Sequence, residues 1–144
     1  MSPLAQISLG SALLLLCALI HILCFTTLLS AFQNWRSTVG HWIFRSDFRT
    51  VVFAILAILT SHTIQVYLWA FSFWLGEMLP DLETSVYFSL VTYTTLGYGD
   101  LTLAPEFRIF GAMGAVVGVL AFGMSTAFLV SFFTRIIESI RSRR

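Results

Sequence analysis

The chain has 144 residues, of which 58% are hydrophobic and only 10% carry charge, a composition that excludes an ordinary soluble domain. A domain of this length has too small a core to enclose so many apolar side chains, so the surplus must face lipid or other copies of the chain. The formal net charge of +1 excludes nothing by itself, because the position of each charge matters more in a membrane protein. We therefore expect an all-α membrane protein that forms oligomers.

The first apolar stretch runs from Leu4 to Phe32 and is long enough to cross a bilayer, which takes about 20 helical residues. A cleaved signal peptide is the alternative interpretation. That reading is disfavoured because no basic segment precedes the stretch and because its apolar run is too long. We expect a retained transmembrane helix.

Two further stretches, Val51 to Leu75 and Ile109 to Phe133, are also long enough to span. Between them, Leu82 to Thr94 is mildly apolar and, at about 13 residues, too short to cross, so it is predicted to be a re-entrant half-helix. The segment Gln33 to Asp47 combines arginine with tryptophan, which favours a loop at the cytoplasmic interface.

Charges along the chain predict its orientation. Arginines cluster between positions 36 and 49 and again from Arg135 onward, whereas acidic residues gather in the connection between the second and third spans. Placing both basic clusters inside puts the acidic connection and the N-terminus outside. The sequence therefore predicts a multi-pass protein of the cell membrane with an external N-terminus and a cytoplasmic C-terminus.

The run from Tyr93 to Asp100, Tyr-Thr-Thr-Leu-Gly-Tyr-Gly-Asp, resembles the Thr-Val-Gly-Tyr-Gly-Asp signature of the potassium channel pore family, with Leu96 where valine is commoner. Its context makes the match specific, since it follows a half-helix, precedes a glycine-bearing span and lies on the predicted outer side. The resemblance covers about residues 81–134, so the first helix lies outside it. It implies a tetrameric channel with three transmembrane helices, a re-entrant pore helix and a filter loop.

The chemistry of such a filter follows from its backbone. A potassium ion sheds water in a narrow pore, and rings of carbonyl oxygens can replace that water. Successive carbonyls point at one axis when ordinary and left-handed residues alternate, and glycine adopts the left-handed form most readily. The resemblance implies potassium ligands at the carbonyls of Thr95, Leu96, Gly97 and Tyr98, with Gly99 completing the filter and the Thr95 hydroxyl adding the innermost ring. Leu96 and Tyr98 are expected to pack against the half-helix.

Neighbouring residues are expected to support this filter. Asp81 suits the N-cap of the half-helix, whose carbonyl end would favour a cation in mid-membrane. The resemblance implies that a half-helix side chain holds Asp100. Because Val91 is apolar where some relatives carry a carboxylate, Tyr87 is the candidate partner, with simple packing as its alternative role. Thr94 is counted with them as filter support.

The third span carries the candidate cavity and gate. Aligned with the family on Phe122, Gly118 matches the hinge glycine of the inner pore helix, and Val119, Phe122 and Thr126 would face the cavity. Glycine also lets helices approach closely in membranes, so packing is the alternative role for Gly118.

The gating stimulus is not evident. No helix carries arginine at every third position, as a voltage sensor requires. His21 and His62 are ionisable groups deep in the first two spans, and Gln65 shares a face with His62. Proton sensing and neutral histidines hydrogen-bonded between helices both remain open.

We interpret the chain as one subunit of a homotetrameric, potassium-selective channel that conducts passively and contacts membrane lipid. Its predicted parts are an N-terminal helix and cytoplasmic loop at 1–47, a pore domain at 48–136 and a basic tail at 137–144. A weakly selective cation channel and a non-conducting auxiliary subunit are the alternatives. Potassium ions are the expected ligand. We expect no organic cofactor, no enzymatic activity, no nucleic-acid partner and no soluble ligand domain.

Overall fold

The computed structural model describes residues 1–38 and 43–141, with side-chain environments for 1–31, 51–135, 137, 138 and 141. Every regular element within those ranges is helical, which confirms the predicted all-α fold. The elements are α1 (Pro3–Thr38), α2 (Ile43–Leu75), α3 (Leu82–Tyr93), a short 3-10 helix η1 (Pro105–Phe107) and α4 (Arg108–Arg141).

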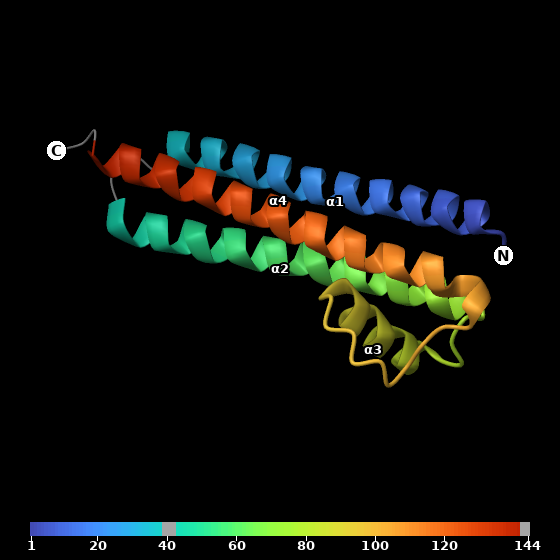
Figure 1. Ribbon diagram of the computed structural model, residues 1–144. Helices are drawn as coiled ribbons and strands as arrows, with labels where there is room; N and C mark the ends of the chain where they lie inside the picture. The colour runs from blue at the N-terminus through green and yellow to red at the C-terminus, as the bar shows by residue number, and fades with distance from the viewer. Residues whose placement is uncertain (39–42, 142–144) are drawn as a thin grey trace.

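The long helices α1, α2 and α4 run side by side, and the short α3 packs against α2 and α4 near one end of the bundle (Figure 1). The N-terminus lies at that same end, and the C-terminus lies at the opposite end. The segment after α3 runs back across this end to reach α4. The half-helix and the segment after it thus begin and end at the same end of the bundle, which is the course predicted for a re-entrant element.

Three segments are long and apolar enough to cross a membrane, namely Pro3–Ala31, Val51–Leu75 and Pro105–Arg135. They confirm the three predicted spans. A helix is the form expected there because lipid offers no partners for backbone amides and carbonyls, so each segment must satisfy its own. The protein is a multi-pass membrane protein.

The loop predicted over residues 33–47 is too long. Helix α1 continues to Thr38 and α2 already begins at Ile43. No proline or glycine interrupts the sequence between Phe32 and Thr38, so nothing local ends the first helix there. The tryptophan and arginine side chains of this segment lie outside the described residues, as do positions 142–144 of the predicted tail.

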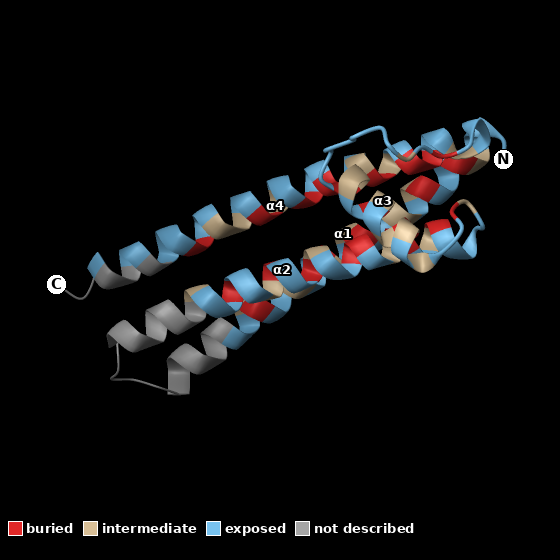
Figure 2. Cartoon of the chain, turned by 90° about the horizontal axis from the view of Figure 1, so that it is seen from below, coloured by how far each residue is buried: buried red, intermediate tan, exposed pale blue. Residues whose placement is uncertain are grey.

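Aromatic side chains form the core where α2, α3 and α4 meet. Trp69 and Phe73 of α2 are almost fully buried, and their ring centroids lie 5.1 Å from Phe110 of α4 and 5.1 Å from Phe88 of α3, respectively. Figure 2 shows the buried residues on the faces that the helices turn toward one another. This cluster fixes α3 against the two spans that flank it.

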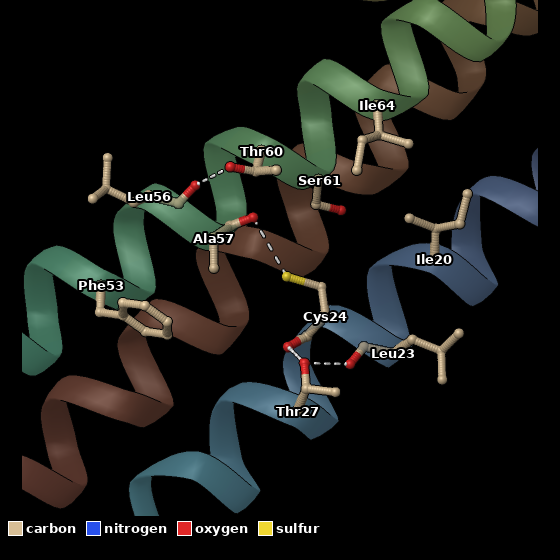
Figure 3. A pocket seen from close by; sticks show the side chains of 10 residues that line it. All are labelled: Ile20, Leu23, Cys24, Thr27, Phe53, Leu56, Ala57, Thr60, Ser61 and Ile64. Atoms are coloured by element: carbon tan, nitrogen blue, oxygen red, sulfur yellow. Dashed lines mark hydrogen bonds between the residues drawn. The ribbon is translucent and has the colours of Figure 1, made fainter.

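Large apolar side chains remain exposed along all three long helices, as expected if lipid or further copies of the chain surround them. An open groove between α1 and α2 is one such surface (Figure 3). None of the described residues that line it is charged, and the Cys24 thiol donates a hydrogen bond between the two helices to the carbonyl oxygen of Ala57 at 3.4 Å. The groove is therefore an apolar surface suited to contact with lipid or with apolar side chains of another copy.

Candidate ion pathway

The half-helix α3 starts at a side-chain cap. Asp81 accepts hydrogen bonds from the backbone amide of Thr84 at 2.8 Å and from its hydroxyl at 2.9 Å, which confirms the predicted N-cap. These bonds, the amide first, lower the pKa of Asp81 below its ordinary value. The carboxylate and Glu83 in the first turn complement the positive end of the helix dipole.

The other end of α3 leads directly into the candidate filter. Thr94 caps the helix, its amide bonding to the carbonyl oxygen of Leu90 at 3.0 Å and its hydroxyl to the same oxygen at 2.7 Å. The amides of Leu96 and Gly97 then both bond to the carbonyl oxygen of Val91, at 2.9 and 3.3 Å. Hydrogen bonds thus connect the first residues of the candidate filter to the last turn of the half-helix.

Left-handed residues alternate with ordinary ones along this segment. Thr95, Gly97 and Gly99 have φ values of +58°, +55° and +78°, whereas Leu96 and Tyr98 between them do not have positive φ. The alternation predicted from the glycines is therefore present, and Thr95 extends it by one residue. A left-handed conformation costs roughly 1–2 kcal/mol for a residue with a side chain, so surrounding contacts must hold Thr95 in place.

The side chains of the filter are less covered than expected. Leu96 is 54% exposed and Tyr98 is 68% exposed, so within one chain neither is buried against the half-helix. The packing of these side chains against α3 therefore stays a prediction. Both side chains offer apolar surface for contacts that one chain does not supply.

Asp100, at the end of the candidate filter, is bonded to a side chain of α3. The Tyr87 hydroxyl donates a hydrogen bond to Asp100 Oδ2, and Asp100 Oδ1 accepts one from the Leu101 amide at 3.0 Å. The bond predicted between Tyr87 and Asp100 is thus present. It raises the pKa of the Tyr87 phenol above its ordinary value of 10.0, because the carboxylate stabilises the protonated donor. Tyr87 connects the half-helix to the Asp100 end of the candidate filter.

Gly118 lies where α4 touches the end of α3. A Cβ atom at this position would be only 1.8 Å from the carbonyl oxygen of Tyr93, the last residue of α3. The packing role left open for Gly118 therefore has a specific contact, while no described feature bears on a hinge.

The other predicted cavity residues divide into two groups. Val119 is 59% exposed and Thr126 is exposed on α4, with its hydroxyl bonded to the carbonyl oxygen of Phe122 at 2.9 Å. Phe122 is also part-exposed, but its ring stacks on His62 at a centroid distance of 4.7 Å and meets Tyr93 at 5.7 Å. Phe122 thus connects α4 to groups around the end of α3.

Two features of this region were missed by sequence reasoning. The first is the Gln6 side chain, whose oxygen accepts hydrogen bonds from the amides of Ile109 and Phe110 at 3.1 and 3.2 Å. The second is the participation of Ser125 and Tyr93 in the hydrogen bonds of His21 and His62. A lone glutamine in an apolar span is a signal in the sequence, because such a residue seeks a partner inside the membrane.

Three membrane spans, a short helix with acidic residues at its start and a segment of alternating left-handed and ordinary residues at its carbonyl end are the features of a membrane channel. A family model described as "Ion channel" matches residues 50–135, which is more than half of the chain. The protein therefore belongs to this ion channel family, and the resemblance to potassium-channel pores is confirmed. It is a channel protein and not an enzyme.

One relative is a potassium voltage-gated channel protein (shk-1) of Caenorhabditis elegans. It is 31% identical over 105 residues, which cover 68% of this chain and 20% of the relative. The chain thus spans about a fifth of that relative's length. No solved structure matches the chain.

Proposed function

We propose that four copies of this chain form a potassium-selective channel through which potassium crosses the membrane passively. The observation that carries the proposal is the alternation of left-handed and ordinary residues from Thr95 to Gly99 at the carbonyl end of α3. Such alternation turns successive carbonyl oxygens to one side of the strand. Four strands around an axis then supply rings of oxygens that replace the water around a dehydrated ion.

Potassium would bind at the carbonyls of Thr95, Leu96, Gly97 and Tyr98. The carbonyl ends of four α3 helices converge beneath these rings and favour a cation in mid-membrane. Tyr87, Thr94 and Asp100 support the strand at its two ends through the hydrogen bonds described above. The exposed rings of Tyr98 and side chains of Leu96 are then covered by the neighbouring subunits, which accounts for their exposure in one chain.

Helix α4 lines the water-filled cavity in this assembly. Val119 and Thr126 support this placement because both are exposed on that helix. Phe122 lies between them on the same face of α4, and part of its ring is exposed. Gly118 and these residues form the region where opening and closing is controlled. The match of the channel family to residues 50–135 supports a pore domain at residues 48–136.

The subunit sits in the cell membrane with its N-terminus and filter outside and its C-terminus in the cytoplasm. Arginines near both cytoplasmic ends and acids near the filter support this orientation. Labelling of single cysteines introduced near Ser2 and near Glu77 with an impermeant reagent tests it, and both sites are expected to react from outside.

Reconstitution tests the function. Purified protein in planar bilayers is expected to give currents that reverse near the potassium equilibrium potential in mixed potassium and sodium, and native mass spectrometry is expected to find four copies. Gly97→Ala, which places a side chain at φ +55°, is expected to abolish the current, while Gly123→Ala, which meets nothing within 4 Å, is expected to retain it. Equal permeability to sodium would favour a weakly selective pore, and a silent tetramer would favour an auxiliary subunit.

A further inference from the structure

A closed ring of hydrogen bonds connects all four α-helices inside the bundle. Its members are His21 of α1, His62 and Gln65 of α2, Tyr93 of α3 and Ser125 of α4. Four of them are buried and His62 is partly buried. The two nitrogens of His21 lie 2.9 Å from Gln65 Nε2 and 2.9 Å from Ser125 Oγ. The two nitrogens of His62 lie 2.9 Å from the same Ser125 Oγ and 2.8 Å from the Tyr93 hydroxyl. The ring closes at 3.1 Å between the Tyr93 hydroxyl and Gln65 Oε1.

Each bond of the ring has a donor and an acceptor when both histidines are neutral. With the Gln65 amide oriented as in the structure, its NH2 donates to His21 Nδ1, so the His21 proton is on Nε2 and is donated to Ser125. The Ser125 hydroxyl proton is then free for His62 Nε2, and His62 Nδ1–H donates to the Tyr93 hydroxyl. Tyr93 donates to the Gln65 oxygen and closes the circuit. The second Gln65 proton faces Ser61 Oγ at 3.2 Å.

One member of the ring, Tyr93, lies two residues before Thr95, the first residue of the proposed filter. Tyr93 is the last residue of α3, its carbonyl oxygen lies against Gly118, and its hydroxyl takes part in two ring bonds. The next two residues are Thr94, the C-cap, and Thr95, the first left-handed residue. Any displacement of Tyr93 would therefore move the turn of α3 to which the filter amides are bonded.

Helix α1 contributes to this ring from outside the part of the chain that the channel family matches, residues 50–135. His21 has no accessible surface and bridges α2 and α4. Its loss would remove one hydrogen bond from Gln65 and one from Ser125, at a cost of about 1–3 kcal/mol for each buried group left unsatisfied. Gln65 would keep its bonds to Ser61 and Tyr93, and Ser125 would keep its bond to His62. Such networks are stable only when all members are satisfied.

We propose that His21 is a positioning residue for the selectivity filter, acting through the hydrogen-bond ring on Tyr93, and that α1 thereby forms part of the ion pathway's support. This inference rests on the proposed function. It assigns α1 a role beyond shielding the pore from lipid, because lipid shielding would not require a histidine with both ring nitrogens bonded. Tyr93 transmits the constraint from the ring to the base of the filter.

The test replaces His21 with phenylalanine, which removes both ring nitrogens. It keeps an aromatic ring against Phe25, whose centroid lies 4.5 Å from that of His21 in the structure. Cys24→Ala is the matched control, one turn along α1, because Cys24 contacts α2 at Ala57 but takes no part in the ring. Tyr93→Phe removes the other end of the constraint. All variants are first checked for assembly by native mass spectrometry.

The first readout is hydrogen exchange at the amides of Leu96 and Gly97, which needs no ion conduction. We expect His21→Phe and Tyr93→Phe to speed this exchange about fivefold, the effect of losing about one hydrogen bond's worth of stabilisation. Cys24→Ala is expected to leave it unchanged. The double variant is expected to match the single ones, because both changes break the same ring.

The second readout is the ratio of potassium to sodium permeability and the duration of current in bilayers, which both ring variants are expected to lower. Unchanged exchange and permeability in assembled His21→Phe channels would overturn the proposal, and so would an equal effect of Cys24→Ala. If His21→Phe does not assemble, His21→Met, which also lacks both ring nitrogens, must show the same local exchange change or the proposal fails. A wild-type protein that exchanges as expected but carries no potassium would refute the proposed function and not the ring's role.

Discussion

The carbonyl oxygen of Tyr93 occupies the space that a side chain at Gly118 would need, since a Cβ there would lie 1.8 Å from it. The obstacle is backbone at the end of α3, which cannot rotate away as a flexible side chain can. At Gly111, by contrast, the nearest atom to such a Cβ is the terminal methyl carbon of Leu103 at 2.7 Å. The contact at Gly118 therefore sets how closely α4 approaches the end of α3.

Gly118→Ala is expected to separate α4 from α3 and to destabilise the protein by about 1–3 kcal/mol or more, the usual range for overpacking. Thermal unfolding of the detergent-solubilised protein measures this loss. Gly123→Ala on the same helix is the control, because nothing lies within 4 Å of a Cβ there. A Gly118→Ala protein with wild-type stability and altered opening would instead favour the hinge.

Tyr87→Phe is expected to shorten the potassium current under sustained conduction while leaving the initial ion selectivity unchanged. The change removes the hydrogen bond to Asp100 but does not alter the left-handed backbone of the filter. Bilayer recordings at constant voltage measure the decay. Tyr67→Phe on the exposed side of α2 is the control, and an equal decay in both variants would argue against the role of Asp100.

Alkaline solution on the filter side should reproduce the effect of Tyr87→Phe. Because the bond to Asp100 raises the pKa of Tyr87, the contribution of this bond is fully present below the ordinary value of 10.0 and is lost as pH rises through the raised pKa. Decay of the wild-type current is therefore expected to stay constant up to about pH 10 and to approach that of Tyr87→Phe only above it. A convergence of the two already near neutral pH would contradict the assignment.

Most of the architecture could be predicted because membrane spans leave a strong signal in composition. The three apolar stretches, the half-helix capped by Asp81 and the left-handed glycines of the filter all follow from local sequence. The loop over 33–47 was predicted too long because charge and tryptophan indicate an interface and not the end of a helix. The exposure of Tyr98 could not be predicted from one chain, since its surroundings belong to an assembly.

The hydrogen-bond ring was only partly predictable. His21, His62 and Gln65 attract attention as polar residues in apolar spans, and the sequence left open that the histidines bond between helices. Ser125 gave no signal, because a serine in a helix can bond to its own backbone. Tyr93 was read as part of the filter motif, and its hydroxyl partner depends on how α3 packs against α2.

The glutamine near the start of α1 leads to the last prediction. Gln6 is 2% exposed, and its oxygen accepts from the amides of Ile109 and Phe110. These amides lie in the first turn of α4, where a helix has no acceptors of its own for its donors. The side chain of one span thus caps another span at the end of the bundle that carries the filter.

Gln6→Ala is expected to lower the free energy of unfolding by about 1–3 kcal/mol, because it leaves buried amides without an acceptor. Gln6→Glu keeps the oxygen and adds a negative charge that the start of α4 favours, so it should lose less. Thermal unfolding gives the stability, and hydrogen exchange at Ile109 and Phe110 locates the change. Ser8→Ala is the control, since Ser8 is exposed and its hydroxyl bonds within α1 to the carbonyl oxygen of Leu4. Equal losses in Gln6→Ala and Ser8→Ala, or unaltered exchange at the start of α4, would show that Gln6 does not cap that helix.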